Sequence, residues 1–354
     1  TFSLLLIASW GVSLVFVSLT YPDVYYAPSG PWILYFYYIA LCVPMIVIIP
    51  FVAFRSLSGE REDGTFDLVA ITTLNPRQIV AGKLGSAVMQ MLIYLSALAP
   101  AMVFTYMLRG VDIMMIVMLL FYLFLTSVTL SVVGLVLATV TTSRAWQMVL
   151  GVIFILALVV LFIIALYSGF GGIFFGSVAY DEPLFWAFHL FVINTVVAYT
   201  TLFYLSAMAR VTFPSDNRST KLRICLVVIH AMAIAWAAYF LLAADEWILI
   251  GFLIWAAFHW WLMGALMVGE TEEISPRVRR ELPQTLMGRS FSIWLYPGPG
   301  SGYMLMGTCF GCITALMVAM AAQPQSAKKA VPTPPSTVPM AAAKRGPRSS
   351  ASRL

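Results

Sequence analysis

Long runs without a charged side chain set the strongest limit on how this chain can fold. Nine stretches of more than 20 residues contain no Asp, Glu, Lys or Arg. A charge at the bilayer centre costs about 2.5 to 3.5 kcal/mol on insertion scales, and a helix needs about 20 residues to cross the hydrocarbon. Each stretch is therefore long enough to span a membrane. They are 1–22, 24–54, 84–108, 113–143, 145–180, 183–209, 224–244, 247–269 and 290–327.

The composition excludes a soluble globule. Of the 354 residues, 61% are apolar and 10% charged, whereas soluble domains carry roughly 25% charged residues. The pattern predicts an all-α fold, a polytopic transmembrane helical bundle. The net charge of +5 does not indicate nucleic acid binding, because the basic residues lie between apolar stretches. The four cysteines lie inside apolar stretches and indicate no disulfide framework.

Lysine and arginine concentrate in the cytoplasmic loops of membrane proteins. The loops after the second, fourth, sixth and eighth stretches contain 13 Lys and Arg residues, and the alternate loops contain only Arg109. This asymmetry predicts that the basic loops and the N-terminus are cytoplasmic.

The C-terminal segment 323–354 conflicts with this topology. It carries six basic residues, no acid and six prolines, which predicts a disordered tail. Nine spans would place the tail outside. Either 303–322 does not cross fully, another span is miscounted, or the tail is translocated despite its charge. The sequence leaves these alternatives open.

The segment 168–179 is apolar but interrupted by glycine. We consider two interpretations equally: a re-entrant or interfacial element, or a flexible external loop. Irregular backbone at membrane depth has to be covered by protein or line a cavity. The candidate glycines are Gly169, Gly171, Gly172 and Gly176.

The loop between the second and third stretches has clear helix signals. Gly64 follows a charged run, and Thr65 can cap a short apolar helix. Asn75, Pro76 and Gln78 form a second helix start, a variant of the capping box, which leads into the third span. The loop is expected to present a short surface helix, anchored on both sides, to a cytoplasmic partner.

This loop resembles that of the membrane permeases of type 2 ATP-binding-cassette (ABC) exporters. The family pattern is an acidic residue and Arg or Lys, then Gly-Thr, a Leu-rich turn, Thr-x-Pro, and Gly-Lys at the next helix. The matching residues occur in the same order and after two spans. They are Glu60, Arg61, Gly64, Thr65, Leu68, Thr73, Pro76, Gly82 and Lys83.

The resemblance implies a six-span permease core over 1–209, with a coupling loop at 55–83 that docks on a separate cytoplasmic ABC ATPase. It implies a dimer with a second permease copy or a paralogue, in the bacterial cytoplasmic membrane. ATP and Mg would be bound by the ATPase, so this chain would be neither an enzyme nor a cofactor carrier. The remainder would be two or three additional C-terminal spans in 210–322, with a cytoplasmic loop at 269–302, and the tail 323–354.

The chain lacks its own energy source. No G-x-x-x-x-G-K-[ST] motif occurs, so the chain cannot bind ATP as a P-loop ATPase does. Ion-coupled carriers usually hold ionisable residues within their spans, but these spans contain no Asp, Glu, Lys or Arg. Both absences favour an exporter powered by a partner.

The histidines and a cysteine pair do not indicate a metal or redox site. His189, His230 and His259 lie in different stretches, and we expect either hydrogen bonds between helices or an interfacial position near flanking tryptophans, as for His259 beside Trp260 and Trp261. Cys309 and Cys312 have redox-motif spacing, but packing of small residues explains them better.

Two other functions remain open. A permease-like scaffold for a maturation or motility complex would bind an ATPase without moving a substrate. A membrane-embedded enzyme is less favoured, because the external acids are scattered and form no convincing catalytic pair. The transported substrate, the choice between homodimer and heterodimer, and the role of the spans after 209 do not follow from the sequence.

Overall fold

A computed structural model describes most of the apolar part of the chain. The described residues are 11, 15, 30–62, 75–108, 110–141, 143–176, 180–213, 216–243, 247–268, 276–281, 285, 287–288 and 294–321.

The described residues form helices and contain no strand. The helices are α2 (Gly30–Cys42), the π-helical η1 (Val43–Ile48), α3 (Ile49–Glu62), α5 (Pro76–Phe104), the 3-10 helix η2 (Thr105–Leu108), α6 (Ile113–Ala138), α7 (Arg144–Phe175), α8 (Pro183–Val211), α9 (Thr220–Ala243), α10 (Trp247–Val268), α11 (Pro276–Glu281) and α13 (Pro299–Ala321).

Six of these helical runs are long and apolar enough to cross a membrane, within the part of the chain that is described. The protein is therefore an all-α, multi-pass membrane protein, as the charge-free stretches predicted. The six runs are Gly30–Arg61, Pro76–Leu108, Ile113–Ala138, Arg144–Phe175, Pro183–Val211 and Thr220–Leu241.

The other three charge-free stretches are less fully represented. Stretch 1–22 lies outside the described residues, apart from Gly11 and Val15. Stretch 247–269 forms α10, whose apolar segment Ile250–Trp261 is shorter, and 290–327 contains α13. The tail 323–354 is not among the described residues. The expected total of nine spans stays a prediction.

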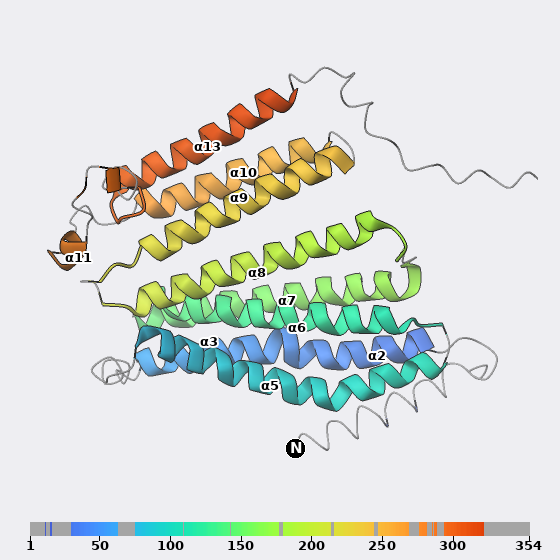
Figure 1. Cartoon of the computed structure of the whole chain (residues 1–354). Coiled ribbons are helices and arrows are strands. Elements are labelled where there is room, and N and C mark those ends of the chain that lie inside the picture. The colour runs from blue at the N-terminus through green and yellow to red at the C-terminus, as the bar shows by residue number, and fades with distance from the viewer. Residues whose placement is uncertain are drawn as a thin grey trace, which may run out of the picture. The chain divides into compact units, whose positions relative to one another are not determined.

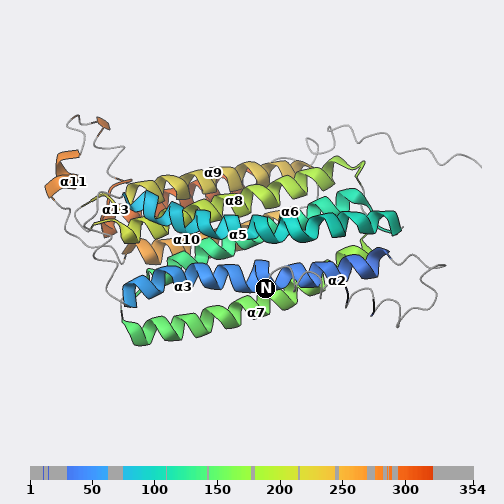
Figure 2. The same cartoon turned by 90° about the horizontal axis from the view of Figure 1, so that it is seen from below.

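Helix α6 is central to the described part of the bundle that α2 to α8 form. It packs against α3, α5, α7 and α8, and α2 packs against α5 and α7 (Figures 1 and 2). The span that contains α2 and α3 is the most enclosed of the six. Because the surrounding solvent is lipid, the apolar side chains left exposed on the bundle are expected at its perimeter.

The C-terminal helices continue this packing, since α9 packs against α8 and α10 against α9. The buried Arg223 of α9 fixes the chain before α13: its guanidinium donates to the carbonyls of Trp294 and Gly298, at 2.8 and 3.0 Å, and to Ser301 Oγ at 2.8 Å. The chain divides into two compact units, Thr1–Cys309 and Phe310–Leu354, with the division inside α13. The expected boundaries at 209 and 322 stay predictions.

The glycine-rich segment differs from the expected interrupted backbone. Gly169, Gly171 and Gly172 lie inside the continuous helix α7, and Gly176 is its C-terminal cap. Through Phe175 the segment continues helix α7, whereas 177–179 lie outside the described residues. The choice between an interfacial element and an external loop stays a prediction. At Gly169 a close helix contact explains the glycine, because a Cβ there would lie 2.2 Å from Tyr38 Cε1.

Candidate functional site

The loop that carries the family resemblance connects the end of α3 to the start of α5. Helix α5 starts as predicted, with Asn75 as its N-cap and Pro76 in the first turn. The Asn75 backbone N–H donates to Gln78 Oε1 at 3.0 Å, and the Gln78 N–H donates to the Asn75 carbonyl at 2.8 Å. These bonds satisfy donors that a helix start leaves open, and so they fix the direction in which the loop enters α5.

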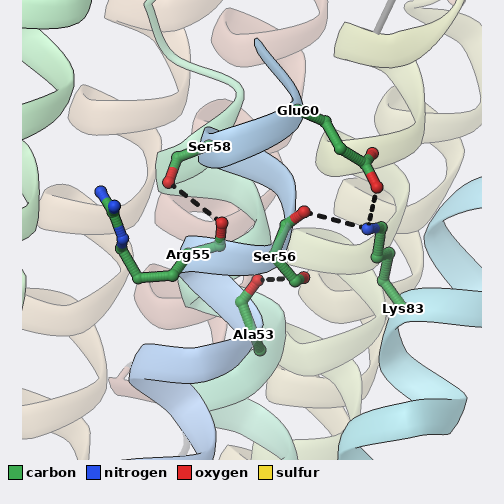
Figure 3. Close-up of polar contacts among 6 residues, drawn as sticks. All are labelled: Ala53, Arg55, Ser56, Ser58, Glu60 and Lys83. Carbon is green, nitrogen blue, oxygen red and sulfur yellow. Dashed lines mark hydrogen bonds and ion pairs between the residues drawn. The ribbon is translucent and has the colours of Figure 1, made fainter. Parts of the chain in front are cut away.

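Lys83 ties α5 to the end of α3. Its ammonium group donates to the Ser56 carbonyl at 2.9 Å and forms an ion pair with the Glu60 carboxylate (Figure 3). The Lys83 and Glu60 side chains are 23% and 31% exposed, so water screens the pair only partly. The two ends of the loop are thus bound to each other.

Two further contacts bind this pair of helix ends to the rest of the bundle. Arg61 Nη1 donates to the Thr139 carbonyl at 3.3 Å, next to the C-terminus of α6. A cation there interacts favourably with the carbonyl end of the helix dipole. The Tyr204 hydroxyl of α8 donates to the Arg77 carbonyl at 3.5 Å, a long bond. Both flanks of the loop therefore contact helices that lie outside it in sequence.

The structure places five of the nine motif residues. Glu60, Arg61 and Lys83 come together at this junction, and Pro76 starts α5. Gly82 is exposed, and a Cβ added there would meet nothing within 4 Å, so packing within this chain does not require a glycine. The other four, Gly64, Thr65, Leu68 and Thr73, lie outside the described residues, as does the expected short helix.

The hydrogen-bond acceptors at this junction could not be predicted from the sequence. Ser56 and Thr139 contribute backbone carbonyls, and a carbonyl is present in every residue, so no sequence signal distinguishes them. Tyr204 could have been noted as a hydroxyl near the basic end of its span, but nothing in the sequence pairs it with Arg77.

The histidines form the expected hydrogen bonds between helices in two of three cases. The Tyr199 hydroxyl of α8 and His259 Nδ1 of α10 lie 2.8 Å apart, and Trp260 Nε1 donates to His230 Nδ1 of α9 at 3.0 Å. His189 Nδ1 instead lies 2.8 Å from the Phe185 carbonyl of its own helix. No group of three or more His, Cys, Asp or Glu side chains among the described residues could hold a metal ion.

In comparisons with known proteins, the chain matches no family model, no curated protein and no solved structure. The functional argument therefore depends on the loop motif and on the geometry of the α3–α5 junction.

Proposed function

We propose that this chain is the transmembrane permease subunit of an ABC-type exporter, powered by ATP that a separate partner subunit hydrolyses. The observation that carries the proposal is the α3–α5 junction. There Glu60, Arg61 and Lys83 of the motif bind the two ends of the loop to each other and to α6. A loop held in this way passes a force from a docked partner to several spans.

In this proposal the segment 65–73 is the surface that contacts the ATPase. Closure of two ATPase subunits moves this segment, and the junction passes the movement to α3, α5 and α6. Two permease copies, or this chain and a paralogue, form the pathway between them. The scarcity of charge within the spans agrees with an energy source outside the chain.

Affinity purification of the full chain from its native membrane tests the proposal. A protein with a Walker motif is expected to copurify and to hydrolyse ATP. The combined variant Gly64→Leu/Pro76→Gly should retain less than about one tenth of this ATPase, because it alters the loop and the start of α5. Pro276→Gly, in the predicted cytoplasmic loop 269–302, is the matched control and should leave association unchanged.

Unchanged association and unchanged ATP hydrolysis with the loop variant would refute the coupling role. The scaffold alternative predicts a different result: the ATPase binds, but culture medium from wild-type and deletion cells contains the same compounds.

A further inference from the structure

The helical run Gly30–Arg61 contains a π-helical turn near its middle. Helices α2, η1 and α3 follow one another without a break, and Met45 lies near the centre of the 32-residue run Gly30–Arg61. At the end of η1 the Ile49 N–H donates to the Pro44 carbonyl, five residues back, where an α-helix would use the carbonyl four residues back. Turns of this kind are rare and often occur at functional sites.

Pro50 leaves one carbonyl of this turn without a backbone donor. The next bond in the π register would run from residue 50 to the Met45 carbonyl, but proline has no N–H. Met45 is fully buried within the bundle, and a carbonyl left unsatisfied away from water is costly.

Helix α6 supplies the missing donor. The Ser127 hydroxyl donates to the Met45 carbonyl at 2.5 Å, and both residues are fully buried. One turn further along α6, Ser131 donates to the Ser127 carbonyl of its own helix at 2.8 Å. The π turn is therefore held by one side chain from a neighbouring span.

The backbone of η1 could also adopt an α-helical register, which differs from the π register by a few hydrogen bonds. In the α register the Ile49 N–H would donate to the Met45 carbonyl, and Pro50 would leave the Ile46 carbonyl without a donor. The Ser127 bond to Met45 thus favours the π register over the α register. A change of register, or a bend at the turn, moves α3 and with it Glu60 and Arg61.

We propose that η1 is the hinge of this span and that Ser127 is the positioning residue that sets its register. The inference rests on the proposed function, because the movement it passes on begins at the α3–α5 junction. Gly134 gives this part of α3 room against α6, since a Cβ at Gly134 would lie 2.9 Å from the Pro50 carbonyl oxygen. The hinge thus lies where α6 follows the α3 backbone closely.

Hydrogen–deuterium exchange of the full chain in phosphatidylethanolamine/phosphatidylglycerol nanodiscs tests the hinge directly. Ser127→Ala should raise exchange of the amides in 45–54 about tenfold, because the Met45 carbonyl loses its donor. Ser131→Ala is the matched control and should change exchange less than about twofold, since it removes only a bond within α6. Ser127→Thr, which keeps a hydroxyl, should behave like the wild type.

The variant Ser127→Ala/Pro50→Ala distinguishes a role of Ser127 in setting the register of η1 from a role in stabilising the helix alone. Residue 50 then has an N–H, so exchange should return to the wild-type rate. ATP hydrolysis by the copurified ATPase complex should nevertheless be at least about fivefold below wild type, because an N–H at residue 50 completes the α register and Ser127 no longer favours the π register. Recovery of both properties, or an equal effect of Ser131→Ala on exchange, would overturn the proposal.

Failure of the proposed function gives a different result. If no ATPase copurifies with the wild-type chain, both the proposed exporter function and the coupling role of the hinge are wrong. The exchange rates of the Ser127 and Ser131 variants then still decide whether η1 opens independently of any partner.

Discussion

At the scale of single residues, the α3–α5 junction depends on groups that reach backbone carbonyls. Lys83 donates to the Ser56 carbonyl and Arg61 donates to the Thr139 carbonyl, and the Lys83–Glu60 ion pair joins two charged side chains. Exposed ion pairs contribute about 1 kcal/mol or less, so we expect these residues to hold the loop more than to stabilise the fold.

Lys83→Ala should therefore release the loop while leaving the unfolding free energy within about 1 kcal/mol of the wild-type value. Limited proteolysis with chymotrypsin, which cleaves after Phe66, measures the release, and we expect cleavage to be several-fold faster. Lys221→Ala, at the start of α9, serves as the control. Equal cleavage rates for the two variants would contradict a role of Lys83 in holding the loop.

Tyr180, between α7 and α8, offers a prediction on pH. Burial and then the neighbouring Asp112 carboxylate raise the pKa of Tyr180 to about 12, above the ordinary value of 10.0. Because the pKa of Tyr180 is higher in the folded state, its contribution to the free energy of unfolding is fully present below pH 10. This contribution is lost as pH rises from about 10 to about 12. Tyrosinate absorbance, taken as the difference between the wild type and Tyr180→Phe, measures the midpoint.

Asp112→Asn should move that midpoint down toward 10, because the substitution removes the negative charge that opposes ionisation. If the midpoint of the Asn variant equals that of the wild type, burial alone accounts for the shift.

At the scale of elements, α2 and α7 are joined near the ends away from the junction by aromatic rings. The Trp32 and Phe174 ring centroids lie 4.5 Å apart, and the Tyr38 hydroxyl donates to the Ala165 carbonyl at 3.1 Å. Gly169 permits this approach, since its missing side chain leaves the space that the Tyr38 ring occupies.

Gly169→Ala should lower the unfolding free energy by about 1 to 3 kcal/mol, because the methyl group would overlap the Tyr38 ring. Gly172→Ala is the matched control in the same helix: a Cβ there meets nothing within 4 Å. That variant should be neutral or up to about 1 kcal/mol more stable, since alanine favours the helix. Thermal unfolding in detergent, followed by circular dichroism, compares the two, and equal stabilities would refute the Gly169 contact.

The elements themselves could be predicted from sequence more readily than their contacts. Absence of charge predicted six described spans, and Asn75-Pro76 predicted the start of α5. The π turn at Val43–Ile48 was not predicted, because its register depends on a hydroxyl from α6 that is distant in sequence. The glycines after Ser168 suggested a broken backbone, but Gly169 serves a contact between helices that no local pattern encodes.

At the scale of the whole molecule, charge lies mainly at one end of the spans. The ends of α3, α5 and α8 that contact one another or α6 carry the basic residues Arg61, Arg77, Lys83 and Arg210. The opposite ends of α6 and α8 are preceded by the acidic residues Asp112 and Glu182. This arrangement agrees with the predicted orientation, in which the junction is cytoplasmic.

The same orientation predicts the side of the tail. The arginine-rich loop 269–302 is predicted to be cytoplasmic, and the 23 residues of α13 are enough to cross the hydrocarbon. A phosphatase reporter fused after Ala322 should therefore be active outside the cell, whereas the same reporter fused after Glu281 should be inactive. An inactive reporter after Ala322 would show that α13 does not cross.

Helix α7 also makes the protein sensitive to the thickness of its membrane. Its 32 residues extend about 48 Å, against about 30 Å of hydrocarbon, and no charged residue follows Arg144 within it. A tilt of about 40°, the upper end of the usual range, reduces that length only to about 37 Å. Either the lipid beside α7 stretches or its Phe175 end stands among the headgroups. In both cases the free energy of the protein in the membrane depends on lipid chain length. Because a thicker bilayer matches α7 better, the protein should accumulate in regions of thicker bilayer.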